Sequence, residues 1–376
     1  MEEQSRQNEN PETSVTENVQ DTAADAVQEA AAAEASPKKA KFGITGSTLK
    51  IIAIISMLID HFGASIVEFY LYNILQPNGT EYSKALICSR VPRLWMEWMG
   101  DPEKVQNLDI TIRSIGRLAF PIFCFLLVEG FLHTRNMKKY LVRLGIFALV
   151  SDLPFDMAFF GEITIKHQNV FFTLFIAVFA LLAADHVKKQ ESFNGFHRFV
   201  DKIGFLIAGA FGAFACITSM GSIVGYIIGA IFDLDDLASI VISGVAGFIA
   251  GFIVYLVKTG KYEAEKKMRI SVGLLYIFGF FTLAELLCTD YGGWGVLAVV
   301  AMWLARPAWI NGFNAGVLAL TIMSFGEATA FISALPVEMY NGKRGLKMKY
   351  FFYAFYPAHL ALYVLLRYVL LGVWGI

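Results

Sequence analysis

The stretch that decides the fold runs from residue 48 to residue 72 and reads TLKIIAIISMLIDHFGASIVEFYLY. It is long enough to cross a bilayer, because a transmembrane helix needs about 20 mainly apolar residues. Four side chains within it are acidic or basic, namely Lys50, Asp60, His61 and Glu68. Such groups are costly inside a membrane and tend to face a partner or a cavity. The stretch therefore predicts a transmembrane helix with polar groups at depth.

Nine more apolar stretches follow the first. Their approximate limits are 113–133, 140–160, 169–187, 203–232, 237–257, 270–288, 292–305, 313–335 and 350–374. The composition, 56% hydrophobic and only 17% charged, argues against an ordinary water-soluble domain. We therefore expect an all-α, polytopic membrane protein with about ten transmembrane helices in residues 46–376. Eleven result if residues 203–232 cross the membrane twice.

A glycine-rich insert lies within this domain at about residues 205–268. Its glycines recur at four-residue spacing, as in Gly247 and Gly251. This spacing lets helix backbones approach closely in lipid. The insert is therefore expected to hold closely packed helices.

Residues 1–45 differ from the rest of the chain. Residues 1–40 hold nine Asp and Glu residues and no aromatic residue. Such a segment buries too little apolar surface to fold, so we expect a disordered acidic tail. Lys and Arg in the short loops place the N-terminus in the cytoplasm, with the protein in the cell (plasma) membrane. Ten spans then put Lys343 and Arg344 on the outside, and eleven spans put them inside.

Two histidines are predicted at mid-membrane. His61 follows Lys50 by three helical turns, on the same face and about 16 Å along the axis. Asp60 points about 100° away from that face and should pair with a neighbouring helix. The last stretch contains Tyr356 and, three residues on, His359, the second mid-depth histidine.

The second stretch carries an arginine beside a proline. Pro121 has no N–H group, so it leaves the carbonyl of Arg117 free and predicts a kink there. Arg117 is either an anchor that reaches the interface or part of a polar chamber. Glu129, three turns further, is expected to pair with a cation on another helix.

The sequence lacks the motifs of several common enzyme classes. It has no Walker loop, no H-E-x-x-H, no G-x-S-x-G and no dinucleotide fingerprint. Its four cysteines form no C-x-x-C pair, so no metal site and no tightly bound cofactor are expected. No nucleic-acid partner is expected, because the charges lie between apolar segments. The remaining His, carboxylate, Arg and Tyr set fits acyl transfer. It fits proton-coupled transport nearly as well.

Five motifs, in order along the chain, resemble the TraX family of integral membrane proteins. That family is named for the enzyme that acetylates the N-terminus of F-type pilin. The motifs are LKIIA and LIDH within 49–61, GRLAFPIF at 116–123, NVFFT at 169–173, DYG at 290–292 with Gly295, and FYAFYPAHL at 352–360. The resemblance runs from about residue 46 to the C-terminus.

The resemblance implies a membrane-bound O- or N-acyltransferase. Such an enzyme would move an acetyl group from acetyl-CoA, as co-substrate, to an amine or hydroxyl of a protein or envelope acceptor. A secondary, proton-coupled transporter and a non-catalytic membrane assembly factor are the alternatives. A transporter usually shows an internal repeat, and none is convincing here.

The resemblance also suggests roles for single residues. The catalytic candidates are His61, Asp60, Arg117 and His359, with His61 preferred over Asp60 as the base. The resemblance suggests Asn169 and Tyr291 as residues that line the chamber, and Glu129 and Tyr356 are added because they lie inside spans. Candidates to bind the phosphates of coenzyme A are Arg135, Lys138, Lys139 and Arg143, with Lys343 and Arg344 if their loop is inside. The positive charge of any cytoplasmic loop explains these basic residues as well.

Overall fold

A computed structural model of the chain describes residues 43–71, 100–219, 227, 229–232, 235–306, 309–346 and 349–371. The acidic tail up to residue 42 lies outside this range, as does most of the loop that follows the first helix. Within the described range there is no strand, only two isolated bridges between residues. The expected all-α class is therefore confirmed.

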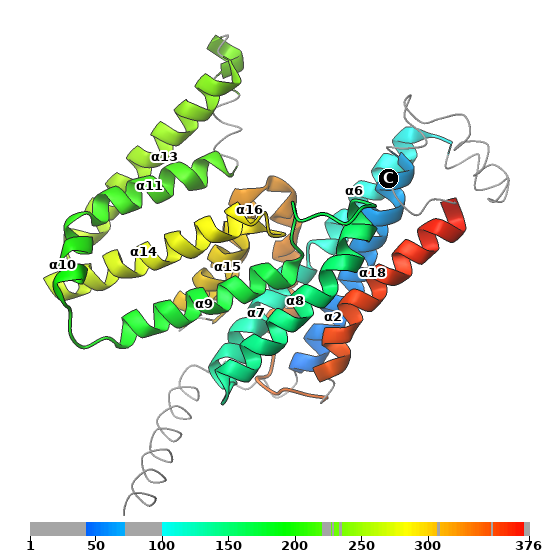
Figure 1. Cartoon of the computed structure of the whole chain (residues 1–376), viewed down its shortest axis with the longest axis horizontal. Coiled ribbons are helices and arrows are strands. Elements are labelled where there is room, and N and C mark those ends of the chain that lie inside the picture. Colours follow the sequence, from blue (N-terminus) through cyan, green and yellow to red (C-terminus); the bar gives the residue numbers. More distant parts are fainter. Residues whose placement is uncertain are drawn as a thin grey trace, which may run out of the picture.

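The chain folds into helices of very unequal length (Figure 1). In chain order they are α2 (Gly46–Phe62), the π-helical turn η1 (Gly63–Val67), α3 (Glu68–Tyr70), α6 (Pro102–Gly116), α7 (Ala119–His133), α8 (Met137–Phe159), α9 (Val170–Lys189), α10 (Gly195–Lys202), α11 (Gly204–Ile217), α13 (Asp236–Thr259), α14 (Ala264–Leu286), α15 (Gly292–Leu304), α16 (Trp309–Met323), the 3₁₀ helix η4 (Phe325–Ser333), α17 (Ala334–Glu338) and α18 (Lys349–Leu371).

Several of these segments are long and apolar enough to cross a membrane. Five qualify among the described residues: 46–70, 102–133, 170–189, 236–259 and 264–286. The pair α10 and α11, bent by 59°, would make a sixth. Helices α8 and α18 have 23 residues each, whereas α15 and α16 have 13 and 15. The chain is thus a polytopic membrane protein, and the expected count of ten spans stays a prediction.

The second span begins earlier than the hydropathy indicated. Helix α6 starts at Pro102, and Asp101 caps it by accepting hydrogen bonds from two backbone N–H groups of its first turn. The expected start of this span at about residue 113 is therefore wrong, because the helical residues 102–112 are too polar to be recognised from hydropathy. The helix breaks between α6 and α7 at Arg117, where the position of Pro121 predicts a kink.

The expected single span at 313–335 is also wrong. Helix α16 ends at Met323, and the chain then turns back as η4 and α17 over residues 325–338. Glu327 interrupts the apolar run there and is drawn into the protein by an ion pair with Arg117. The pairing of Glu327 with Arg117 inside the protein therefore explains why the span does not continue to residue 335.

This return segment decides where the loop at 341–346 lies. Ile44 forms a parallel bridge with Tyr340, and the N–H of Gly46 donates to the carbonyl of Lys343 at 2.8 Å. The loop therefore lies at the end of the molecule where α2 begins, as does the start of α18 (Figure 1). The placement of Lys343 and Arg344 opposite the N-terminus, as ten spans required, is wrong. The irregular return at 325–338 is the reason.

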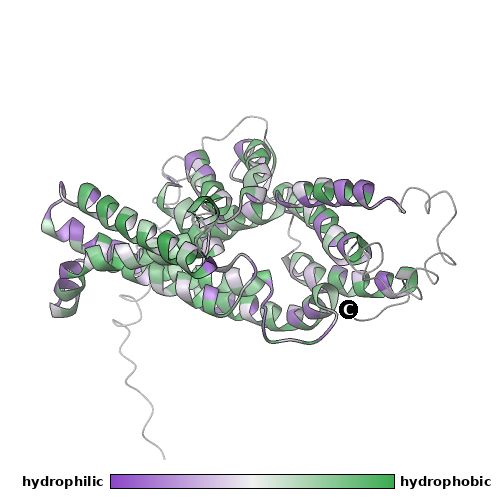
Figure 2. Cartoon of the chain, turned by 90° about the horizontal axis from the view of Figure 1, so that it is seen from above, coloured by the Kyte–Doolittle hydropathy of each residue, from purple (hydrophilic) through white to green (hydrophobic). Residues whose placement is uncertain are grey.

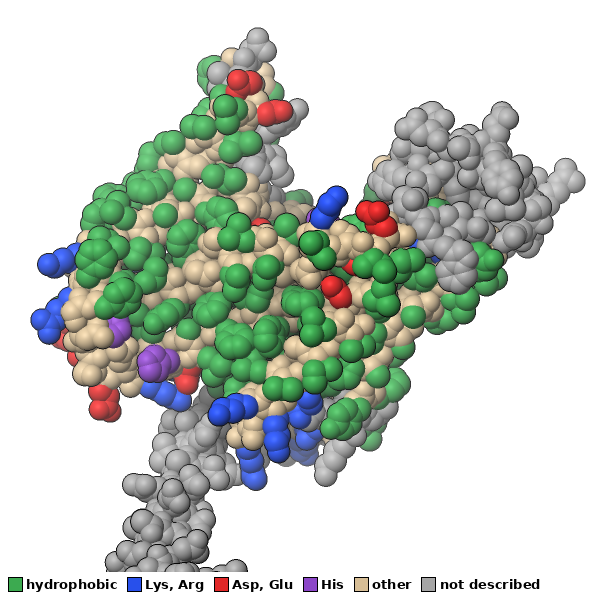
Figure 3. All heavy atoms as spheres, in the orientation of Figure 1, with side chains coloured by type: hydrophobic (Ala, Val, Ile, Leu, Met, Phe, Trp, Pro, Cys, Tyr) green, Lys and Arg blue, Asp and Glu red, His purple; other side chains and the backbone are tan. Residues whose placement is uncertain are grey.

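The core lies where α7, α9 and α15 meet. Ile122, Ala177 and Val299, one from each helix, are fully buried. Hydropathy colouring shows apolar residues along nearly all of the long helices (Figure 2). Hydrophobic side chains also cover most of the outer face in Figure 3, with Lys and Arg gathered along its lower and left edges. This distribution is that of a protein whose flanks face lipid.

Helices α11 and α13 pack through glycine, as the four-residue spacing predicted. A Cβ atom on Gly212 would lie 2.2 Å from the carbonyl oxygen of Gly247. A Cβ on Gly251 would lie equally close to the carbonyl oxygen of Ala208. The two backbones are therefore in direct contact, and no larger residue fits along this line of contact.

Candidate active site

The two histidines that were predicted at mid-membrane form one site. His61 is the second-last residue of α2, and His359 lies in the middle of α18. Nδ1 of His61 is 2.7 Å from Nε2 of His359, which is a hydrogen bond between residues 298 positions apart. Both side chains are buried, with relative exposures of 9% and 3%. Side chains predicted separately in the first and last spans therefore meet.

Aromatic rings enclose the histidine pair. The ring of Tyr356 packs edge-on against both His61 and His359, with centroid distances of 5.9 and 5.5 Å. Phe159 of α8 packs edge-on against His61 at 5.2 Å. Tyr356 thus lies beside the histidine pair. The site sits where α2, α8 and α18 converge.

An ion-pair network adjoins the histidines. Oδ1 of Asp60 is 2.7 Å from Nη1 of Arg113 on α6, so Asp60 pairs with a neighbouring helix, as predicted. Nε of Arg113 also reaches Glu68 at 3.1 Å. The other oxygen of Asp60 lies 4.0 Å from Nε2 of His61. Asp60 therefore connects the histidine pair to a cation.

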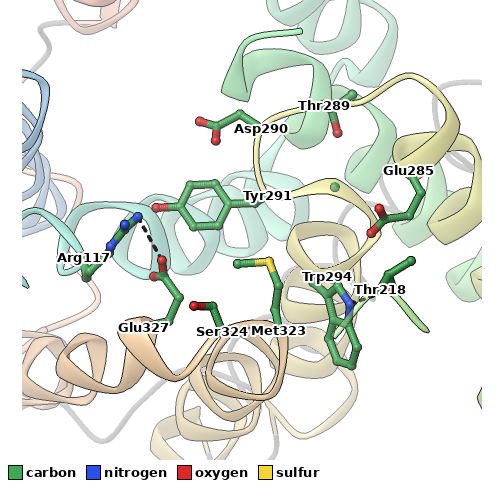
Figure 4. Close-up of a pocket in the computed structure, with 11 residues that line it drawn as sticks. Arg117, Thr218, Glu285, Thr289, Asp290, Tyr291, Trp294, Met323, Ser324 and Glu327 are labelled. Carbon is green, nitrogen blue, oxygen red and sulfur yellow. Dashed lines mark hydrogen bonds and ion pairs between the residues drawn. The ribbon is translucent and has the colours of Figure 1, made fainter. Parts of the chain in front are cut away.

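A second network surrounds Arg117 at the break between α6 and α7. Its guanidinium lies 2.9 Å from Oε1 of Glu327, so Arg117 has an internal partner, and the hydroxyl of Tyr291 points toward it (Figure 4). The ring of Tyr291 stacks on Phe120 with a centroid distance of 3.7 Å. Its backbone has φ of +64°, a left-handed conformation that is costly for a residue with a side chain. The position of this ring is therefore enforced by the surrounding structure.

These residues line a cavity of about 370 Å³ (Figure 4). Its lining comes from the ends of α11, α14 and α16, the turn before α15, and η4. The full set is Arg117, Thr218, Glu285, Thr289, Asp290, Tyr291, Gly292, Trp294, Met323, Ser324 and Glu327. Three carboxylates and one guanidinium therefore border the space, and Glu327 is paired with Arg117.

The cavity lies at the end of the molecule opposite the start of α2. Its turn at Thr289 bridges to Gln168, which lies in the loop between α8 and α9. Glu327 is only 2% exposed, and its Oε2 atom makes no hydrogen bond among the described residues. A buried carboxylate oxygen without a donor suits a ligand that carries one.

Of the four expected lining residues, Tyr291 lines this cavity and the other three do not; Tyr356 lies beside the histidine pair. Glu129 pairs with Arg306 at 2.6 Å, so its predicted cation on another helix exists, but neither residue lines the cavity. Asn169 caps α9 by accepting a bond from the N–H of Phe171, and its amide donates to the carbonyl of Ala148. The geometry of Asn169 is that of a clamp between α8 and α9.

The basic residues proposed for coenzyme A lie at the end where α2 begins. Arg135, Lys138 and Lys139 are exposed at the turn between α7 and α8, at the lower end of Figure 1. Lys343 and Arg344 are exposed beside the start of α2. Arg143 is half-buried and reaches the hydroxyl of Tyr353 on α18. Whether they bind phosphate stays a prediction.

Six charged residues of these networks and of the cavity were not among the predicted site residues: Glu68, Arg113, Glu285, Asp290, Arg306 and Glu327. Arg113 stands four positions before Arg117 in the same helix, and Asp290 precedes Tyr291 in the DYG motif. Glu327 lies within an apolar run, where a carboxylate needs a partner. In the part of the chain that the structure describes, no group of three or more His, Cys, Asp or Glu is arranged to hold a metal ion.

Comparison with known proteins agrees with this architecture. The family model described as TraX protein matches residues 45–233 and 248–367. The chain is also similar to the probable fimbrial assembly protein FimC, serogroup H1, of Dichelobacter nodosus, at 26% identity over 261 residues. That match covers 67% of this chain and 80% of the relative. No solved structure matches the chain significantly. Because the family model covers most of the chain, this membrane protein belongs to the TraX family.

Proposed function

We propose that the protein is a membrane-bound acyltransferase that moves an acetyl group from acetyl-CoA to an amine of a protein acceptor. The observation that carries the proposal is the buried pair of His61 and His359, joined through Asp60 to a cation and placed near a cavity that Arg117 lines. A buried imidazole beside a fixed carboxylate is the usual arrangement of a general base.

The residues divide the reaction between them. His61 takes a proton from the acceptor N–H as the nitrogen lone pair attacks the thioester carbonyl carbon. The oxyanion that forms accepts hydrogen bonds from donors such as Arg117 and the hydroxyl of Tyr291. The carbonyl then re-forms, the carbon–sulfur bond breaks, and the thiolate of coenzyme A takes the proton back from His61. Asp60, 4.0 Å from Nε2, stabilises the imidazolium in between.

The charge of the cavity favours an amine acceptor over a hydroxyl. The lining contains three acidic residues and one arginine, namely Glu285, Asp290, Glu327 and Arg117. Such a cavity attracts the protonated, positively charged form of an amine, which then loses its proton before it reacts. The relative from Dichelobacter nodosus is named for fimbrial assembly. A subunit of a surface fibre, with its free amine, is therefore the acceptor that we propose.

The donor would come from the opposite end. Coenzyme A is too polar to enter lipid and needs cations for its phosphates. Exposed Arg135, Lys138 and Lys139, with Lys343 and Arg344 at the same end, supply such cations, and Arg143 lies next to them. We assign this end, with the N-terminus, to the cytoplasmic face of the plasma membrane.

The test is release of free thiol from acetyl-CoA by the protein in lipid nanodiscs, which needs no knowledge of the acceptor. Wild-type protein should bind acetyl-CoA and hydrolyse it slowly, or acetylate itself. His61→Gln should bind acetyl-CoA equally but release thiol at least about 100-fold more slowly. His186→Gln is the matched control, since His186 is exposed at the end of α9. Wild-type protein that neither binds acetyl-CoA nor releases thiol would refute the proposal.

A further inference from the structure

The two histidine rings meet edge to edge. Their planes differ by 11°, and their centroids are 5.0 Å apart, nearly twice the 2.7 Å between the bonded nitrogens. Rings stacked face to face would not bring one nitrogen so close to another at that centroid distance. The lone pair of an imidazole nitrogen lies in the ring plane, so this geometry suits a strong hydrogen bond.

A backbone carbonyl fixes the direction of that bond. Nδ1 of His359 lies 2.9 Å from the carbonyl oxygen of Phe355. A carbonyl only accepts, so Nδ1 of His359 carries the hydrogen, and in the neutral ring its Nε2 has the lone pair. The hydrogen between the rings must then belong to Nδ1 of His61. Nε2 of His61 is left without a hydrogen, and it lies on the side of Asp60.

We infer that His359 is a positioning residue that holds His61 in the tautomer whose Nε2 is free to accept a proton. This inference rests on the proposed function, in which His61 is the base. It gives His359, one of the catalytic candidates, a role other than that of a base, because both of its ring nitrogens are engaged within the protein. When Nε2 of His61 takes a proton, the bond from its Nδ1 to His359 becomes charge-assisted and stronger.

Aromatic packing holds the hydrogen-bonded pair of His61 and His359 in place. The ring of Phe355 stacks parallel to His359 at 5.3 Å, and the ring of Tyr363 packs against its other side at 88°. The hydroxyl of Tyr363 donates to the carbonyl of Leu58 on α2, which ties α18 to the helix that carries His61. Contacts of this kind restrict the orientation of His359 and so keep the ring of His61 in one position.

The first experiment reads the tautomer directly and does not depend on activity. Solid-state ¹⁵N NMR of histidine-labelled protein in nanodiscs separates protonated from unprotonated ring nitrogens, and His61→Gln and His359→Gln assign the signals. In wild-type protein we expect His61 protonated at Nδ1 and unprotonated at Nε2, and the same pattern for His359. A hydrogen on Nε2 of His61 in the neutral ring would overturn the inference.

The second experiment separates positioning from packing. His359→Leu should lower kcat for thiol release at least about 100-fold while the KM for acetyl-CoA stays unchanged. His359→Gln should recover most of that loss, because its amide oxygen can accept the bond from Nδ1 of His61. Equal kcat in wild-type and His359→Leu protein would overturn the inference. If no variant and no wild-type protein releases thiol, the proposed function fails, while the NMR result still decides the tautomer.

Discussion

The carboxylate of Asp60 reaches Arg113 because residue 116 is glycine. A Cβ atom at Gly116 would lie 2.2 Å from Oδ1 of Asp60, the oxygen that is 2.7 Å from Nη1 of Arg113. Helix α6 thus approaches α2 closely at the level of His61. Packing between these helices and the electrostatics of the candidate base therefore depend on the same missing side chain.

Gly116→Ala is expected to damage activity more than folding. The new methyl group must displace Asp60, which costs about 1–3 kcal/mol of stability and breaks the contact with Arg113. Thiol release from acetyl-CoA should fall at least about 10-fold, with most of the protein still inserted. Gly273→Ala on α14 is the control, because no atom lies within 4 Å of a Cβ there. Full activity in Gly116→Ala would show that the position of Asp60 does not matter.

The cavity and the start of α2 lie at opposite ends of the molecule, so a cysteine at each end should be labelled from a different side of the membrane. Cys288 is exposed near the cavity, whereas Lys343 lies beside the start of α2. In a Cys88→Ser background, a membrane-impermeant maleimide should label Cys288 on intact cells. With Cys288 also replaced, Lys343→Cys should be labelled only after permeabilisation. Labelling of both positions from the same side would contradict the return of the chain at residues 325–338.

Prediction from sequence succeeded where a single helix carries the signal. Periodicity placed His61 and Asp60 on different faces of one helix, and Pro121 marked the break beside Arg117. It failed where the partner is distant in sequence. The hydrogen bond between His61 and His359 joins the first and last spans, and no local pattern encodes that contact.

The prediction for residues 325–338 failed for a different reason. Hydropathy counts apolar residues and does not see that η4 is a 3₁₀ helix held inside the protein by Glu327. Irregular backbone is tolerated at membrane depth when it is buried in protein. The side of the loop at 341–346 follows from this segment, so it could be assigned only once Ile44 was seen beside Tyr340.

The pair of Glu129 and Arg306 is expected to matter for stability and not for chemistry. Both side chains are more than 90% buried, and they lie outside the cavity lining. Glu129→Ala leaves Arg306 as an unpaired buried charge and should cost about 3–5 kcal/mol. The double variant Glu129→Leu with Arg306→Met should recover most of this loss and keep thiol release.

Unfolding in detergent measures both effects, with Glu162→Ala on an exposed turn as the control. If the double variant is stable but inactive, Glu129 takes part in the reaction after all.

Arg117→Lys provides the sharpest test of the cavity. The planar guanidinium pairs with Glu327 and lies toward the hydroxyl of Tyr291 (Figure 4), and a lysine ammonium reproduces the charge but not the planar fork. The variant should insert normally, because lysine serves equally well as an interfacial anchor. Its kcat for thiol release should fall at least about 100-fold, since a donor to the oxyanion is lost, while acetyl-CoA binding is retained. Arg198→Lys, at an exposed position in α10, controls for the exchange of residue type. An unchanged kcat in Arg117→Lys would show that Arg117 has a structural role only. The donor to the oxyanion would then have to be another residue.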